Sequence, residues 1–265
     1  FECTFNLGAS SGLFGLATSL SGDVRPDPSG DPSDTWWESF IRPGITGTSP
    51  AGKGSLVAKF SVVGERTYAA PPPIVGSEAS SFKVENLSLT WRSGKELSMG
   101  ENALDVTLGR AQYTIGHGLL LWDGGGEGGT RGGFWSNARK AWAFAGVARF
   151  HAKKNTVEAF YLNRDEVPES ESGTRVFGGN YERTIGSATT LGASYLHFLA
   201  DSTFPERDGL NVFNLRAYSA PLRKEPDLSF EFEYALENNG DLRKSNAWNV
   251  LASYQLSKMK WAPKI

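Results

Sequence analysis

The residues from Leu228 to Leu236, LSFEFEYAL, alternate between large apolar side chains and small or charged ones. A period of two is typical of a β-strand whose two faces meet different surroundings. One face of this strand carries three aromatic residues in succession, and the other carries the carboxylates Glu231 and Glu233. Strands of this kind build a sheet with one apolar face and one polar face, which restricts the fold more than any other feature of the sequence.

The same alternation recurs along the chain and predicts about twelve strands, spaced roughly every 20 residues. They lie near residues 5–18, 36–45, 56–63, 86–92, 104–112, 142–150, 156–162, 176–183, 191–199, 213–218, 228–236 and 246–257. A thirteenth strand is indicated at Trp261, where a new alternating segment begins. Helical signals are almost absent, and no run approaches the ~18 apolar residues of a membrane helix. We therefore expect an all-β fold.

The linkers between these strands differ in length in a regular way. Short linkers at 49–54, 151–155 and 186–189 contrast with long polar linkers at 21–34, 64–81, 164–173, 199–209 and 236–245. Short turns at one end of a sheet and long loops at the other are typical of a transmembrane β-barrel. A soluble β-sandwich is the alternative, because its strands alternate too. The strand spacing is about double the 8 to 12 residues of sandwich strands, which favours the antiparallel transmembrane β-barrel.

Aromatic residues lie toward the ends of the apolar faces, as the interfacial girdles of membrane barrels require. The predicted girdle residues are Trp36, Trp37, Trp91, Tyr161, Tyr195, Trp248 and Tyr254. In this interpretation outer-membrane lipid covers the apolar face, and an aqueous lumen meets the polar one. Because backbone groups in lipid must all be paired, the sheet has to close.

The two ends of the sequence indicate a part of a larger domain. FECTFNLGAS at the start lacks the basic and apolar regions of a signal peptide, and WAPKI at the end stops within a new alternating segment. We expect residues 1–265 to form a single β-barrel domain, incomplete at both termini, in the outer membrane of a Gram-negative bacterium.

Composition and motifs give little support for catalysis. The net charge of −2 offers no general attraction for nucleic acid, and the single Cys3 has no second cysteine for a disulfide. His117, His151 and His197 have no metal-ligand spacing, and no GxSxG motif is present. The glycine run at 124–129 lacks the Lys-Ser/Thr pair of a phosphate-binding loop. We expect no enzyme activity, no metal and no cofactor.

A long glycine-rich stretch between the strands near 104–112 and 142–150 is the most distinctive segment. A loop this long inside a β domain is usually functional. Residues Gly124 to Gly133 could fold inward and narrow a channel, or could form a flexible extracellular loop, and both remain open. Strict alternation places Arg110 on the apolar face, where an arginine near the bilayer midplane costs ~2–4 kcal/mol. We prefer a bulge at Gly109 that turns Arg110 inward.

The charged residues predicted to face the lumen have both signs and would create a transverse field, which attracts a charged solute without trapping it. From the alternation they are Glu38, Arg42, Lys59, Arg92, Asp105, Arg110, Glu158, Arg183, Arg216, Glu231 and Glu233. Glu231 and Glu233 share a strand face about 7 Å apart. That spacing would suit a catalytic carboxylate pair, but a pore lining needs the same pattern, and we favour the lining.

Several segments resemble the alginate-export family of bacterial outer-membrane porins. They are LTWRSGKEL followed by LDVTLGRAQYTIGHGLLLWDG, then NARKAWAFAGVARF, and then TRVFGGNYERTIGSATTLGASYLHFLAD. The likeness covers most of the chain from Trp36 onward and is strongest between Phe82 and Asp201. It implies a monomeric antiparallel barrel of about 18 strands. It also implies an arginine-rich lumen that passes an anionic polysaccharide.

Carried over by position, the resemblance implies a lumen role for Arg110 in the GRAQ segment, and also for Arg139 and Arg149. The sequence departs from the family in its lumen acids, such as Glu158, and in its near-neutral charge. The solute therefore stays open between anionic and neutral saccharides.

These expectations favour an outer-membrane porin or channel for passive diffusion or export of saccharides or small anionic solutes. The alternative is a soluble carbohydrate-binding β-sandwich protein. A third hypothesis, an outer-membrane lipase or protease, would need a Ser/His or acidic constellation that the sequence does not show.

Overall fold

The fold is given by a computed structural model, which describes residues 2–15, 35–68, 79–97, 99–133, 138–186, 188–200, 203–219 and 227–256, with side chains for all of these except 2–15, 35–38, 68 and 200. Most of this part of the chain is β-strand. The strands are β1 Glu2–Gly15, β2 Thr35–Ala51, β3 Gly54–Tyr68, β4 Ala79–Arg92, β5 Leu104–Ala111, β6 Trp142–Ala152, β7 Asn155–Asn163, β8 Arg175–Ile185, β9 Thr189–Ala200, β10 Asn211–Ser219, β11 Leu228–Asn239 and β12 Arg243–Tyr254.

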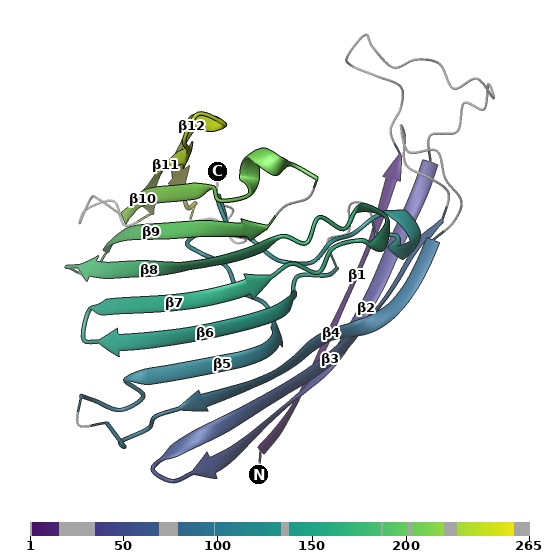
Figure 1. The fold of residues 1–265 in the computed structure, drawn as a ribbon. Coiled ribbons are helices and arrows are strands. Elements are labelled where there is room, and N and C mark those ends of the chain that lie inside the picture. The colour runs from purple at the N-terminus through teal and green to yellow at the C-terminus, as the bar shows by residue number, and fades with distance from the viewer. Residues whose placement is uncertain are drawn as a thin grey trace.

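Each strand pairs antiparallel with the strands before and after it in the chain. The result is one twelve-stranded sheet in the order β1 to β12, in which β1 and β12 are the two edges. The sheet is strongly curved, as Figure 1 shows. The predicted all-β antiparallel fold is therefore confirmed, and a strand lies at every one of the twelve predicted positions.

One predicted loop is wrong. Residues 236–245 are mostly strand, because β11 continues to Asn239 and β12 begins at Arg243. Only a tight turn with Gly240 at φ 57° separates them. The alternation is hidden there because polar residues occupy both faces of the two strands. The thirteenth strand predicted at Trp261 lies outside the described residues.

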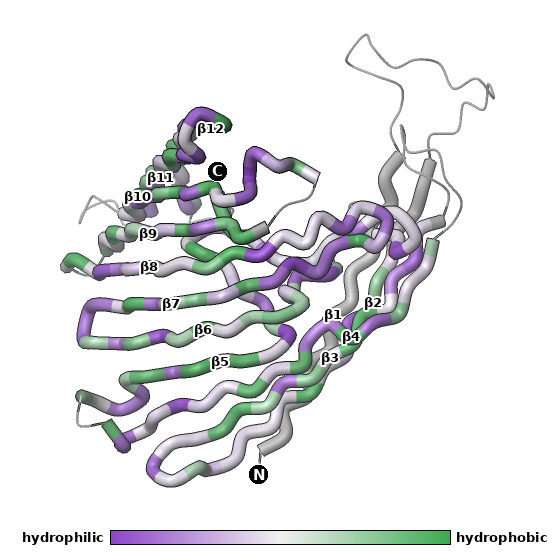
Figure 2. The backbone as a smooth tube through the Cα atoms, viewed as in Figure 1, coloured by the Kyte–Doolittle hydropathy of each residue, from purple (hydrophilic) through white to green (hydrophobic). Residues whose placement is uncertain are grey.

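The two faces of the sheet reverse the usual polarity of a soluble protein. One face, here called the outer face, carries exposed apolar side chains such as Leu215 (59% exposed) and Phe213 (51% exposed). The opposite face, here called the inner face, carries buried polar side chains such as Glu158 (6% exposed) and Arg216 (3% exposed). Figure 2 shows hydrophobic and hydrophilic residues alternating along the strands. The sidedness of each strand follows directly from this local pattern.

All twelve strands belong to one sheet, so the described residues contain no second sheet on which the outer face could pack. This finding argues against the soluble β-sandwich, in which two sheets bury their apolar faces against each other.

The connections are short at one end of the sheet and long at the other. Residues 52–53 and 153–154 form tight turns, and only three residues separate β8 from β9, whereas the long connections 112–141 and 164–174 lie at the opposite end. Among the connections that the structure describes, the exceptions are the longer one at 93–103 and the tight turn at 240–242, and most of the β10–β11 connection lies outside the described residues. Three 3₁₀ helices, Gly129–Arg131, Pro168–Ser170 and Pro205–Arg207, lie in the long connections. Within the described residues, none of the helices has the length and apolar character to cross a membrane.

Candidate pore lining and inward segment

A lateral row of polar side chains crosses the inner face of neighbouring strands. The antiparallel registers place Arg92 of β4, Asp105 of β5, Arg149 of β6 and Glu158 of β7 side by side, so that positive and negative charges alternate. The row continues on β8, β9 and β10 through Asn180, Ser194 and Asn214. Directly opposite residues have Cβ atoms roughly 4.5–5.5 Å apart. Each charge in the row therefore has an opposite charge beside it.

Glu158 is one centre of a hydrogen-bond network within this row. Its carboxylate accepts hydrogen bonds from Arg149 Nε, from Tyr113 Oη at 3.1 Å and from Asn180 Nδ2 at 2.6 Å. A buried carboxylate is stable only when its oxygens have such partners. The network therefore holds Glu158 in a defined position on the inner face.

Arg216 is the second centre, and its side chain is fully buried. Nη1 donates to Ser194 Oγ at 2.6 Å and to Asn214 Oδ1 at 2.8 Å, and Nη2 donates to Asn180 Oδ1 and to Glu182 Oε1 at 2.9 Å. With these four acceptors the guanidinium is committed to the wall of the sheet and does not project from it.

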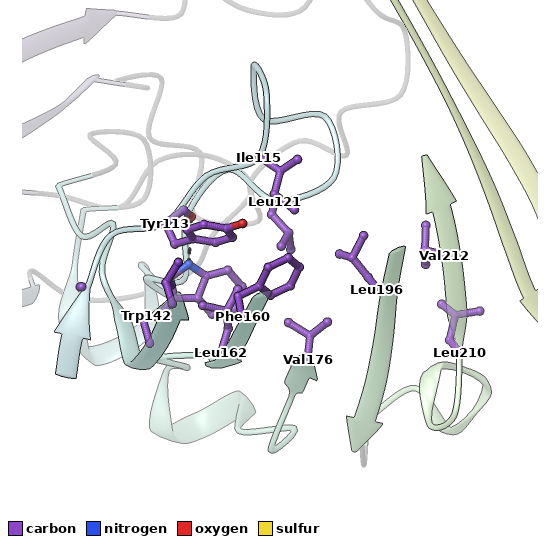
Figure 3. Close-up of a cluster of buried hydrophobic side chains, with 13 residues drawn as sticks. Tyr113, Ile115, Leu121, Trp142, Phe160, Leu162, Val176, Leu196, Leu210 and Val212 are labelled. Carbon is purple, nitrogen blue, oxygen red and sulfur yellow. Dashed lines mark hydrogen bonds between the residues drawn. The ribbon is translucent and has the colours of Figure 1, made fainter. Parts of the chain in front are cut away.

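Residues 112–141, here called the inward segment, connect β5 to β6, and their described parts, 112–133 and 138–141, lie over the inner face. Tyr113, Ile115 and Leu121 from the segment are buried in an apolar cluster with inner-face side chains of the sheet (Figure 3). The sheet contributes Trp142, Phe160, Leu162, Val176, Leu196 and Val212. Full burial of one such apolar side chain stabilises by roughly 1.5–3 kcal/mol. The stretch Gly124 to Gly133, whose position the sequence left open, packs against the β7–β8 connection through Gly126 and against β3 through Gly133.

Polar contacts join this cluster to the wall. Tyr113 donates to Glu158, and Trp142 Nε1 donates to the Tyr113 carbonyl oxygen at 3.0 Å. Burial, reinforced by the negative charge of Glu158, raises the pKa of Tyr113. The phenol therefore stays protonated and remains a hydrogen-bond donor over the whole physiological pH range.

The glycine-rich part of the inward segment lies directly against other backbone. A Cβ atom on Gly125 would lie 2.5 Å from the carbonyl carbon of Arg139. The amide of Gly126 donates to the Asp165 carbonyl at 2.6 Å, and the amide of Asp165 donates to the Gly124 carbonyl at 2.8 Å. Only residues without a side chain allow this approach. The glycine run is thus a packing feature of the inward segment.

Three arginines converge on one carboxylate beside this contact, in a group here called the arginine knot. Asp165, in the connection between β7 and β8, binds Arg139 Nη2 at 2.7 Å and Arg131 Nη1 at 3.3 Å, and it also binds Arg110 Nη2. The four side chains are between 2% and 16% exposed. The knot ties the end of β5 and two points of the inward segment to the β7–β8 connection.

Two opposing effects set the pKa of Asp165. Burial alone would raise it, but hydrogen bonds and positive charge from Arg110 and Arg139 outweigh burial and lower the pKa. The neighbouring Glu166 behaves in the same way: burial opposes ionisation, and hydrogen bonds from Ser172 and Gly173 prevail and lower its pKa. Both carboxylates therefore stay charged near neutral pH.

The far end of the inward segment is bound to the other side of the sheet. Glu85 Oε1 on β4 accepts hydrogen bonds from the amides of Lys140 at 2.7 Å and Ala141 at 2.9 Å. Arg42 Nη1 on β2 donates to the Ala138 carbonyl at 3.2 Å. Residues 138–141 of the segment are thus bound to β2 and β4, whereas its apolar residues pack against β7 to β10. The segment therefore crosses the space in front of the inner face.

A cavity of about 270 Å³, here called the basic pocket, lies between the inward segment and strands β3 to β6. Lys59, Arg92 and Arg149 line it together with the single carboxylate of Asp105. Its other polar lining residues are Asn86, Ser88, Thr90, Thr107 and Gln112. Neither Lys59 nor Arg92 forms an ion pair with another described residue. The pocket therefore offers excess positive charge, together with hydroxyl and amide groups that can bind a polar solute.

A second cavity of about 170 Å³, here called the acidic pocket, lies between the tip of the inward segment and strands β10 to β12. Its lining residues are His117, Gly118, Leu119, Trp122, Tyr218, Glu231, Glu233 and Asn249. The two pockets thus lie on opposite sides of the inward segment and carry opposite charge.

Nine of the residues predicted to face a lumen lie on the inner face. They are Arg42, Lys59, Arg92, Asp105, Arg149, Glu158, Arg216, Glu231 and Glu233. Five of them line the basic and acidic pockets: Lys59, Arg92, Asp105, Glu231 and Glu233, of which Glu233 is only 4% exposed. Glu158 and Arg216 are structural members of the wall.

The prediction for Arg183 is wrong. It lies opposite Leu191 on the outer face, two residues from Tyr181, and its side chain is exposed. Its position is only a few residues from the 186–188 turn, where a long cationic side chain can reach water while its aliphatic part covers apolar surface.

Arg110 and Arg139 are also placed differently from the prediction. The bulge expected at Gly109 is present, since the β5–β6 register shifts between Gly109 and Ala111 and Gly109 has φ 117°. The Arg110 guanidinium is nevertheless bound to Asp165, and Arg139 is almost fully buried in the same arginine knot. Neither arginine is a free cation on the inner face.

The predicted girdle residues with described side chains lie on the outer face: Trp91, Tyr161, Tyr195, Trp248 and Tyr254. Trp91 and Tyr195 fall in the same lateral row of the register, which runs through Val106, Ala148, Ala159 and Gly179. The side chains of Trp36, Trp37 and Glu38 lie outside the described part of β2.

Sequence reasoning missed Asp165, the role of Arg131 and the contacts of His117 with β10 and β11. Asp165 belongs to a polar loop of many acidic and hydroxyl residues, and no local pattern distinguishes it from its neighbours. Its partners are 26, 34 and 55 residues away in the chain. Among the described residues, no three His, Cys, Asp or Glu side chains come together as a metal site would require.

A scan of the sequence against protein-family models finds no match, and a search of the curated proteins finds none. Among solved structures, the chain is similar to mutants of the porin of Rhodopseudomonas blastica. A double mutant of that porin is 15% identical with a TM-score of 0.41, and the match covers 96% of this chain and 91% of the porin. A triple mutant is 13% identical with a TM-score of 0.40 and the same coverage. At these values the likeness supports no inference about function.

Proposed function

We propose that this chain forms the wall of an outer-membrane channel through which saccharides or small anionic solutes pass by diffusion. The reversed polarity of the sheet is the observation that carries the proposal. Exposed Leu215 and Phe213 on one face and buried Glu158 and Arg216 on the other would be a costly arrangement in water. The same arrangement is the favourable one when hydrocarbon covers the outer face and water fills the inner side.

The extent of the outer face supports a lipid environment. Exposed large apolar side chains occur on nearly every strand from β2 to β12, among them Ile41, Phe60, Leu89, Leu108, Phe144, Phe177, Phe213, Phe232 and Trp248. Monomeric soluble proteins rarely expose contiguous apolar patches beyond a few hundred Å². Since backbone groups in hydrocarbon need partners, the proposal requires that the edges of β1 and β12 be paired in the membrane. A barrel of about 18 strands, as in the family that the sequence resembles, would do so.

The inward segment and the basic pocket support the solute class. The segment lies on the polar side of the sheet and would narrow the lumen there. Lys59 and Arg92 remain free of ion pairs with described residues, and Arg149 lies beside them. Cations of this kind attract an anionic solute, while the surrounding hydroxyl and amide groups suit the hydroxyls of a sugar. The resemblance to alginate-export porins agrees with a solute of this chemistry. In this proposal the protein is a monomer without enzyme activity, metal or cofactor.

A matched pair of arginine substitutions tests the proposal in planar lipid bilayers. Arg92→Gln removes an exposed cation from the inner face, and Arg183→Gln removes an exposed cation from the outer face. The native protein should give discrete conductance steps. Arg92→Gln should lower the ratio of anion to cation permeability, and Arg183→Gln should leave the ratio unchanged. A protein that remains monodisperse in water without detergent, or that gives no conductance after membrane insertion, would overturn the proposal.

A further inference from the structure

The acidic pocket combines two carboxylates with an exposed aromatic ring. Glu231 and Glu233 are two residues apart on β11, so their side chains project from the same face about 7 Å apart. Trp122, at the tip of the inward segment, is 54% exposed and lines the same cavity. Asn249 on β12 adds an amide group on the opposite side from β10.

Each carboxylate is held in position through one oxygen, and Glu233, which is only 4% exposed, is reached through the cavity that it lines. Glu231 Oε2 lies 2.6 Å from His117 Nδ1, and Glu233 Oε1 accepts a hydrogen bond from Tyr218 Oη at 3.0 Å. Among the described residues, no hydrogen bond reaches the second oxygen of either group. The stacked rings of His117 and Tyr218, with centroids 4.1 Å apart, fix the geometry between them.

The nearest wall cation makes no hydrogen bond to this pair among the described residues. Arg216 lies directly opposite Glu233 across the β10–β11 register, but its Nη1 and Nη2 donate to other groups, including Glu182. Glu231 and Glu233 therefore bring two carboxylates to the pocket, and the imidazole of His117 contacts one of them. The Lys140 ammonium, 6.0 Å from the centroid of the Trp122 ring, shows that a cation already approaches this ring.

We propose that the acidic pocket binds the ammonium group of a small organic amine. The ammonium lies between Glu231 and Glu233, where its three N–H donors meet the available carboxylate oxygens. The carbon part of the solute packs on Trp122, and a hydroxyl group on the solute bonds to Asn249. The inference rests on the proposed function because the pocket lies on the side of the sheet that would face the lumen. Binding of the amine itself does not require that the protein conduct.

Three probes of matched size and different charge test this assignment: isopropanolamine, propylene glycol and lactate. Binding to the detergent-solubilised protein is measured by saturation-transfer NMR titration, in parallel with bilayer conductance. We expect isopropanolamine to bind at least about tenfold more tightly than propylene glycol, because hydrogen bonds between charged groups are the stronger ones. Lactate should show the weakest binding to this pocket.

Two substitutions locate the effect. Glu231→Gln should reduce the affinity for isopropanolamine about tenfold. Trp122→Ala, at an exposed position that is not needed for packing of the sheet, should reduce it about two- to fivefold. Asp241→Asn in the β11–β12 turn removes a fully exposed carboxylate outside the pocket and should change nothing.

The inference is overturned if the three probes bind equally, or if Glu231→Gln and Trp122→Ala both keep the preference for the amine. Conductance without amine preference would leave the channel proposal standing and remove this one. The protein could also bind the amine, lose affinity in both variants and yet not conduct. That result would support the proposal for the acidic pocket and refute the proposal of a channel.

Discussion

Asp165→Asn is the substitution that should release part of the inward segment. It removes the carboxylate shared by Arg110, Arg131 and Arg139 and keeps the side-chain volume. Arg139 is 2% exposed, so its guanidinium would stay buried without its charge partner. A buried cation in that state favours any conformation that exposes it to water.

The size of the effect follows from the burial of the arginine knot. Removing one partner of a buried ion pair costs about 3–5 kcal/mol. Asp165 retains 13% side-chain exposure, so the lower end of this range, about 3 kcal/mol, applies. Since 1.4 kcal/mol corresponds to a factor of ten, the equilibrium between packed and released segment should shift roughly a hundredfold toward release.

Hydrogen exchange measured by mass spectrometry on the detergent-solubilised protein resolves where the release occurs. The amides of Gly124 and Gly126, which donate to Lys140 and Asp165, should exchange about a hundredfold faster in the variant. The amide of Ile115 should keep its protection, because the buried apolar cluster holds that part of the segment independently.

Glu171→Gln is the matched control, since Glu171 lies exposed in the same connection and forms no ion pair with a described residue. Equal protection of the Gly124 and Gly126 amides in the native protein and in Asp165→Asn would refute the reasoning. Loss of protection at Ile115 to the same extent would show that the two halves of the segment are not independent.

Three further predictions test other parts of the structure. Leu215→Arg, at an exposed outer-face position, should cost about 2–4 kcal/mol of unfolding free energy in lipid bilayers; a cost near zero in a urea titration would indicate that water, not lipid, covers this face. Phe160→Ala should lower the unfolding free energy, measured by the same titration, by about 3–5 kcal/mol because of the cavity it leaves. It should also remove the hydrogen-exchange protection of the Ile115 amide, which Asp165→Asn retains. An unchanged unfolding midpoint would contradict the packing shown in Figure 3. In the folded protein, hydrogen bonds from Arg110 and Arg139 outweigh burial and lower the pKa of Asp165. Ionised Asp165 therefore stabilises the folded protein fully at pH values above the pKa of the unfolded chain, about 3.9. This stabilisation is lost as the pH falls through the lower pKa of the folded protein. After correction for the intrinsic exchange rate, hydrogen exchange at the Gly126 amide should therefore accelerate on acidification in the native protein. In Asp165→Asn it should be independent of pH. A parallel response in both proteins would exclude Asp165 as the titrating group.

Much of the fold could be predicted because sidedness in a strand is local. The face on which Phe232 or Glu233 lies follows from the residues immediately before and after it, and hydropathy reports that face directly. This reasoning located all twelve strands and placed eight charged residues on the inner face, and the resemblance added Arg149. It failed at 236–245, where the two faces do not differ in polarity, and at Arg183, where a cation occupies an outer-face position.

From the residues alone, the alternation predicts strands that each have an apolar and a polar face, and the structure joins them into one sheet. Only the tertiary structure decided which charges stay accessible on the polar face. Whether an arginine is free, as Arg92 is, or bound, as Arg110 is to Asp165 from 55 residues away, depends on strand register and on the path of the inward segment. Neither is encoded in a local period, because an ion pair forms wherever the folded chain brings two charges within reach of each other.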